Sequence, residues 1–149
     1  MRRLLLPAFC VGLAAGCFVL GATAAVAASP DLRGTWGVEG DSIVEGAAPF
    51  HPANASPAAQ GMAPRLRHVT LTLRVDGQEG ERFWGVATNA DATEDFIGSF
   101  TGEPGGRFLL VDVDGFMEGT VGADGIMRYC YRHVTPTSRV ISCGTATGK

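Results

Sequence analysis

Charge is scarce in this chain of 149 residues. Only 18% of the residues are charged, and 12 Lys and Arg against 15 Asp and Glu leave a formal net charge of -3. Because binding to a phosphate backbone depends on clustered basic side chains, this balance excludes nucleic acid as an expected partner. The 21 Gly and 8 Pro show no Gly-X-Y repeat and are too many for a long coiled coil. A hydrophobic content of 46% argues against disorder and predicts one compact domain.

No charged residue lies between Leu4 and Ala28, directly after the basic start Met1-Arg2-Arg3. A short basic start, an uncharged apolar run and small residues at the end of that run are typical of a secretory signal peptide. Residues 1–28 are therefore predicted to be a signal peptide that is cleaved after Ala27 or Ala28.

Two other interpretations of this segment are an uncleaved membrane anchor and a lipoprotein. An uncleaved membrane anchor is disfavoured because the second half of the run is mostly Ala, Gly and Thr, which are weakly apolar. A lipoprotein acylated at Cys17 is disfavoured because further apolar residues follow that cysteine instead of a polar tether. Residues 29–149 are thus expected to form a single periplasmic or secreted domain without a stable membrane anchor.

Cysteine is rare in this expected mature domain. Cys10 and Cys17 belong to the predicted signal peptide, which leaves Cys130 and Cys143. A pair of cysteines in an oxidising compartment predicts a disulfide. A turn near Pro136 would place the two residues opposite each other on the last two strands. A redox-active pair is disfavoured because the Cys-x-x-Cys spacing is missing.

Helical periodicity is also missing after residue 28, where apolar residues recur with a period close to two. In the segment Arg65–Val75, for example, Val69, Leu71 and Leu73 fall on one face of an extended chain. Eight strands are predicted in this way: Gly34–Glu45, Arg65–Val75, Glu81–Thr88, Glu94–Thr101, Arg107–Val113, Phe116–Val121, Gly125–His133 and Arg139–Thr147.

Short turn sequences such as Asp76-Gly77 and Asp114-Gly115 separate these strands and predict sequential antiparallel hairpins. Glycine follows large apolar residues in three strands, at Phe83-Trp84-Gly85, Phe96-Ile97-Gly98 and Phe116-Met117-Glu118-Gly119. Glycine inside a strand marks a bend or a close approach, which favours a closed sheet over a flat sandwich. The expected fold is all-β, an eight-stranded antiparallel up-and-down barrel whose first and last strands pair.

One connection, Gly46–Pro64, is long and rich in Ala and Pro. Long loops without secondary structure are uncommon in compact domains. Two interpretations stay open, a lid or binding loop over one end of the barrel and a variable surface loop.

Gly34-Thr35-Trp36, at the start of the first predicted strand, resembles the Gly-x-Trp opening of the calycin superfamily, which includes lipocalins and avidins. The resemblance implies an eight-stranded meander around a small-molecule cavity, with Trp36 closing one end of the barrel. The second tryptophan, Trp84, leaves too few rings for the aromatic box of an avidin, so biotin is not expected. The wider pattern, including Val111-Asp112-Val113-Asp114-Gly115 and Tyr129-Cys130-Tyr131, also resembles small exported bacterial proteins of unassigned function.

Motifs for catalysis, cofactors and metals are missing. The chain has no Gly-x-Ser-x-Gly elbow, so no catalytic residue is assigned and neither an enzyme nor a cofactor is expected. Asp112, Asp114 and Glu118 suggest calcium, but their spacing does not match an EF-hand, and Asp114-Gly115 is better explained as a hairpin corner. The three histidines are far apart, and no metal site is predicted.

The leading hypothesis is a non-enzymatic exported barrel that binds a small, partly apolar ligand. Trp36, Trp84 and Phe108 are the candidate lining residues, although alternation alone does not decide which face of a strand points inward. The alternative is a periplasmic protein-binding module, such as an inhibitor of a protease or wall hydrolase, with a solid interior. A homodimer is also considered, because Phe108-Leu109-Leu110-Val111 is apolar on both faces.

Overall fold

The computed structural model describes residues 29–46, 63–90, 92–102, 106–136 and 138–148, so the predicted signal peptide and most of the connection after Gly46 lie outside it. Eight strands make up the described chain. In order they are β1 (Gly34–Gly46), β2 (Arg65–Glu79), β3 (Arg82–Thr88), β4 (Thr93–Phe100), β5 (Arg107–Val111), β6 (Gly115–Val121), β7 (Ile126–Val134) and β8 (Ser138–Gly148).

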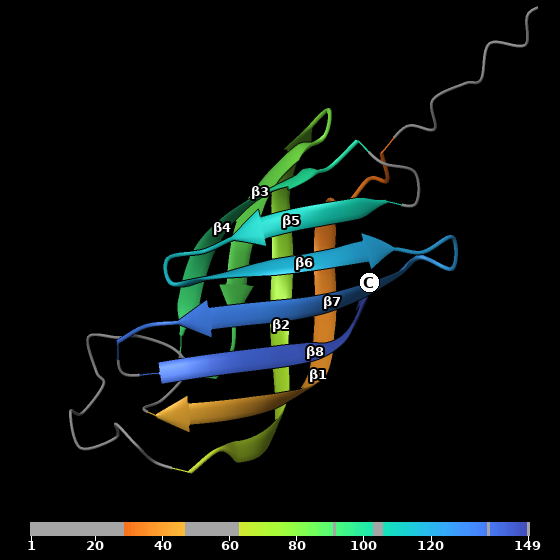
Figure 1. Ribbon diagram of the computed structural model, residues 1–149. Helices are drawn as coiled ribbons and strands as arrows, with labels where there is room; N and C mark the ends of the chain where they lie inside the picture. Colours follow the sequence, from red (N-terminus) through yellow and green to blue (C-terminus); the bar gives the residue numbers. More distant parts are fainter. Residues whose placement is uncertain (1–28, 47–62, 91, 103–105, 137, 149) are drawn as a thin grey trace, which may run out of the picture.

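The strands form one closed barrel (Figure 1). Each strand pairs antiparallel with the next one along the chain, and β1 also pairs with β8, from Trp36 opposite Gly148 to Gly46 opposite Ser138. The predicted up-and-down barrel is therefore confirmed, and closure leaves the sheet without an unpaired edge. Within the part of the chain that the structure describes, no helix is long and apolar enough to cross a membrane.

The Asp76-Gly77 turn was predicted wrongly, because β2 continues through this pair to Glu79. The chain reverses at Gly80, which has a φ of +59°. The register of β2 against β3 shifts between Val75 and Gly77, which marks a β-bulge, and a Cβ at position 77 would collide with the ring of Trp84. At this position the Asp-Gly pair forms a β-bulge, and the glycine leaves room for the Trp84 ring. The pair does not form a hairpin turn.

Cys130 of β7 lies directly opposite Cys143 of β8, and the two sulfur atoms are bonded. The predicted disulfide is confirmed. It joins the two strands of the C-terminal hairpin, 13 residues apart in the sequence.

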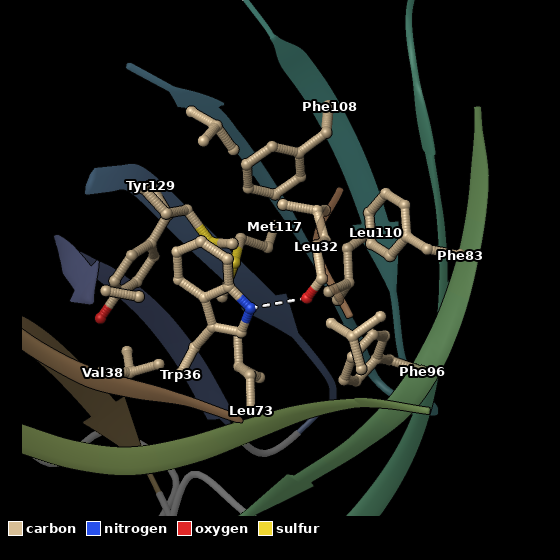
Figure 2. Packing of buried hydrophobic residues seen from close by; sticks show 14 of the residues in the cluster. Leu32, Trp36, Val38, Leu73, Phe83, Phe96, Phe108, Leu110, Met117 and Tyr129 are labelled. Carbon is tan, nitrogen blue, oxygen red and sulfur yellow. Dashed lines mark hydrogen bonds between the residues drawn. The ribbon is translucent and has the colours of Figure 1, made fainter. Parts of the chain in front are cut away.

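The segment before β1 closes one end of the barrel. Leu32 is fully buried, and its carbonyl oxygen accepts a hydrogen bond of 2.7 Å from Trp36 Nε1 (Figure 2). Gln78 of β2 holds the same segment, since its side chain accepts from Leu32 N at 2.9 Å and donates to Pro30 O at 3.0 Å. Trp36 and residues 30–32, which we call the Leu32 plug, thus close one end of the barrel. Both polar groups of the Gln78 side-chain amide form hydrogen bonds with this plug.

Phenylalanine rings fill the barrel next to this plug. Their centroids lie 5.7 to 6.4 Å apart in tilted or edge-to-face pairs, formed by Phe83, Phe96, Phe100 and Phe108. Three glycines provide the space for these rings, because a Cβ would collide with a ring at each position: Gly85 with Phe96, Gly98 with Phe83 and Gly119 with Phe108. The glycines singled out in the sequence therefore mark close approach, as predicted.

An exposed ion pair in the turn between β6 and β7 makes the stability depend on pH. Asp124 Oδ2 accepts from Arg128 Nη2 at 2.8 Å, and Asp124 Oδ1 accepts from Ile126 N at 3.0 Å. The Arg128 side chain, followed by the Ile126 amide, lowers the pKa of Asp124 from 3.8 to about 2. Since the native state holds this proton less readily than the unfolded chain, the pair stabilises the fold above about pH 4, and that contribution is lost towards about pH 2.

We therefore expect Asp124→Asn to unfold at a slightly lower urea concentration than the wild type at neutral pH. The difference should disappear as the pH falls to about 2, because the wild-type carboxylate is then protonated as well. Urea unfolding of both proteins across this pH range tests the prediction. A difference of constant size at every pH would contradict it.

Candidate functional site

A cavity of about 550 Å³ occupies the end of the barrel opposite the Leu32 plug. Its floor is apolar and is shared with the core, where Leu73, Phe96, Leu110, Met117 and Tyr129 project inward (Figure 2). Nearer the mouth the inward positions carry smaller side chains: Ser42, Val44, Ala87, Val140 and Ser142. The cavity therefore arises because the bulky inward side chains are concentrated at one end of the strands.

One wall of the cavity carries buried hydroxyl groups. The hydroxyls of Tyr129 and Ser142 are inaccessible to solvent and make no well-aligned hydrogen bond to any residue that the structure describes. Burial raises the pKa of Tyr129, while the nearby Ser142 hydroxyl has a smaller opposite effect. Ser42 differs, since its hydroxyl donates a long bond of 3.4 Å to Arg67 O. The two hydroxyls thus lie close to each other in an otherwise apolar wall, shielded from solvent.

A neighbouring part of the wall, beyond Tyr131 of β7, is acidic. Glu94 and Asp112 line the cavity, and one carboxylate oxygen of each lies within 4.8 Å of the other and of an oxygen of Asp114. The Tyr131 hydroxyl donates to Asp114 Oδ1 at 3.1 Å and to Asp112 Oδ1 at 3.4 Å. Burial first, and the two aspartates second, raise the pKa of Tyr131 far above its usual value. Tyr131 therefore stays a neutral hydrogen-bond donor that orients both carboxylates.

His133 lies behind this acidic wall. Its side chain is 1% exposed, that of Asp114 is 5% exposed, and His133 Nδ1 is 3.0 Å from Asp114 Oδ1. The ring is not oriented to form a hydrogen bond along this contact, and neither ring nitrogen bonds to another described residue. Such a buried and unsatisfied imidazole calls for a specific explanation.

The tight turn between β5 and β6 places the two aspartates. Asp112 Oδ1 accepts from Gly115 N at 2.7 Å and from Asp114 N at 3.2 Å, which closes the turn. A Cβ at Gly115 would collide with the Tyr131 hydroxyl. A hairpin corner is present, but its central residues are Val113 and Asp114 and not Asp114-Gly115, because Gly115 already belongs to β6 and Asp112 N donates to Gly115 O across the turn. The corner brings a second carboxylate to the acidic wall.

The three candidate lining residues lie elsewhere, since none of them is among the residues that line the cavity. Trp36 packs at the plugged end and Phe108 is fully buried in the aromatic cluster. Trp84 is 45% exposed on the outside of the barrel, because its neighbours Phe83 and Gly85 take the inward positions of β3. The structure therefore assigns the lining of this cavity to other side chains.

The acidic residues considered for calcium are only partly brought together. Asp112 and Asp114 are neighbours in space, whereas Glu118 pairs with Arg132 on β7. The third carboxylate is Glu94, at the start of β4. Glu94 was missed because β4 and β5 are antiparallel, so the start of one lies beside the end of the other. Only the barrel register reveals this neighbour.

Tyr129, Tyr131 and His133 were also missed as site residues. A signal was present, because the three residues alternate along β7 with the inward-facing period of two. Two tyrosines and a histidine facing a barrel interior near the end of one strand predict a polar site there.

Comparison with protein-family models, with curated proteins and with solved structures finds no match.

Proposed function

We propose that this protein is an exported, non-enzymatic barrel that binds a small, partly apolar molecule in its cavity. The observation that carries the proposal is the interior space of about 550 Å³ at one end of an otherwise filled barrel. Pockets for small molecules commonly measure about 300 to 1,000 Å³ and are mostly apolar with a few convergent polar groups. The cavity has this size and this composition.

The two polar walls define the expected ligand further. An apolar body would lie on the floor formed by Leu73, Phe96 and Met117. A polar group of the ligand would bond to the Tyr129 and Ser142 hydroxyls after a small rotation of these side chains, since both residues line the cavity. Hydrogen-bond donors of the ligand would meet the carboxylates of the neighbouring acidic wall. The expected ligand is therefore an amphiphile of modest size.

Export is the second element of the proposal. The predicted signal peptide at residues 1–28 lies outside the described residues, but the disulfide between Cys130 and Cys143 suits an oxidising compartment. A periplasmic or secreted protein with this cavity fits binding or carrying a small molecule outside the cytoplasm.

We expect wild-type protein to bind the apolar dye Nile red in a saturable manner, and Ala87→Phe to weaken this binding at least about tenfold, or 1.4 kcal/mol. Ala87 lines the cavity, so a phenyl ring at this position occupies the ligand space. Fluorescence titration measures the affinity, and unfolding in urea confirms that the variant is folded.

Thr88→Phe is the matched control. Thr88 is the next residue along β3, is exposed and faces outward, so this variant places the same ring outside the barrel. Its affinity for the dye should equal that of the wild type. Dye binding that survives Ala87→Phe would place the dye on the outer surface, and this result would overturn the proposal.

A protein partner is the second candidate, favoured by an outer apolar patch on β5 to β7. This patch consists of side chains that are each more than 40% exposed: Leu109, Val111, Val113, Phe116 and Val134. Exposed apolar groups at this density are typical of protein interfaces. Sedimentation of the purified protein tests self-association, and capture by the wild type but not by Val113→Glu tests another partner. A monomer that captures no protein would remove this candidate.

A further inference from the structure

We propose that the acidic cluster formed by Glu94, Asp112 and Asp114 binds a hard divalent cation such as Ca²⁺ or Mn²⁺. The three residues come from the start of β4 and from the turn between β5 and β6, and one oxygen of each lies within 4.8 Å of the others. One ion with oxygen ligands at about 2.1 to 2.6 Å can contact all three at this separation after small side-chain movements. The inference goes beyond the proposed ligand binding and does not depend on it.

Charge supports this assignment. Carboxylates whose oxygens lie within 4.8 Å of one another repel each other. The arginine pairs described for this barrel lie elsewhere, for example Arg128 with Asp124 and Arg132 with Glu118, and none involves Asp112 or Asp114. A bound cation would turn this repulsion into attraction.

His133 is an independent observation that points to the same place. Its side chain is 99% buried and faces the cluster, with Nδ1 3.0 Å from Asp114 Oδ1. Neither ring nitrogen forms a well-aligned hydrogen bond within the described residues, and Asp114 Oδ2 has no such partner either. Carboxylates that bind a metal are usually hydrogen-bonded by a second layer of side chains, and a small rotation of the His133 ring would let it donate to Asp114 in this way. We therefore assign His133 as a positioning residue for Asp114.

The donor set decides the class of cation. Three carboxylates give an all-oxygen, strongly negative site, which suits Ca²⁺, Mg²⁺ or Mn²⁺ better than a soft metal. The Tyr131 hydroxyl and the amides of Asp114 and Gly115 hold the two aspartates in place by donating to Oδ atoms. Because Glu94 and Asp112 also line the cavity, a cation would reach the cluster from the cavity.

Terbium luminescence tests the site directly. Tb³⁺ replaces hard cations at oxygen sites, and the Tyr131 ring is close enough to transfer excitation energy to it. We expect saturable Tb³⁺ luminescence on excitation of tyrosine in the wild type, and its displacement by Ca²⁺ or Mn²⁺. Asp114→Asn and Glu94→Gln should each weaken Tb³⁺ binding at least about tenfold, and His133→Asn should weaken it by about 10- to 100-fold.

Asp95→Asn is the control, because Asp95 follows Glu94 on β4 but is exposed on the outer face. Its affinity for Tb³⁺ should match that of the wild type. Ca²⁺ should also raise the Tm of the wild type but not that of Asp114→Asn, since a ligand of the native state stabilises it. Absence of saturable luminescence in the folded wild type, or an equal loss in Asp95→Asn, would overturn the assignment.

Discussion

Replacing Phe108 by Ala should lower the free energy of unfolding by about 3 to 5 kcal/mol, the range for removing a large ring from a packed core. Phe108 is fully buried, and its ring contacts those of Phe83 and Phe100 with centroids 6.1 and 6.4 Å away. It also covers Gly119. The surrounding sheet is closed into a barrel, so it can relax only partly into the space. Urea unfolding measures the loss.

Leu109→Ala is the matched control, because Leu109 is the next residue on β5 and is 46% exposed on the outside. Its loss should be within about 0.5 kcal/mol. Phe108→Leu, a milder change, should leave Nile red affinity unaltered, since Phe108 does not line the cavity. A Phe108→Ala variant as stable as wild type but impaired in dye binding would show that Phe108 serves the ligand and not the core.

Removing the disulfide should have the second large effect. Cys130→Ser with Cys143→Ser should lower the free energy of unfolding by roughly 3 kcal/mol, because the bond restricts the unfolded chain over a separation of 13 residues. The native hairpin keeps its hydrogen-bonded pairing of β7 with β8 in the variant, so the barrel should still form. Urea unfolding of the oxidised wild type and of the double variant measures the difference.

Reduction provides the control for this prediction. A thiol reductant should lower the stability of the wild type to about that of the double variant, and should leave the double variant unchanged. Equal stability of oxidised and reduced wild type would contradict the prediction. A double variant much less stable than the reduced wild type would show instead that the serine hydroxyls, and not the lost constraint, cause the effect.

The interior of the barrel is packed at one end and hollow at the other. The plug at Leu32 and Trp36 and the four phenylalanines fill one end, so the fold does not depend on a ligand for its core. The other end can then be left hollow, with polar groups on its walls. This division explains how one small domain can have both a packed core and a cavity.

Much of the fold was predictable because a barrel strand depends on local patterns. The period of two identified all eight strands, and the glycines of β3, β4 and β6 indicated where rings from neighbouring strands approach closely. The Asp76-Gly77 error shows the limit of such patterns. Gly77 is required by the Trp84 ring from the next strand, a contact that turn propensity does not contain.

The site was harder to predict, because alternation gives relative faces without saying which one is inside. Trp84 looks like a lining residue until the pairing of β3 with both neighbours places Phe83 inside. Asp112 and Asp114 look like turn residues alone until β4 brings Glu94 beside them. In both cases the missing information was the position of a side chain from another strand.

Sequence alone was therefore sufficient for the order of the strands and the pairing of Cys130 with Cys143, because both follow from near neighbours along the chain. The closed barrel was predicted as well, from the glycines inside the strands, although closure itself joins the distant strands β1 and β8. The location of the cavity, the outward position of Trp84 and the meeting of Glu94 with Asp112 and Asp114 required the folded barrel. These features depend on register and curvature, which are set by many distant contacts acting together.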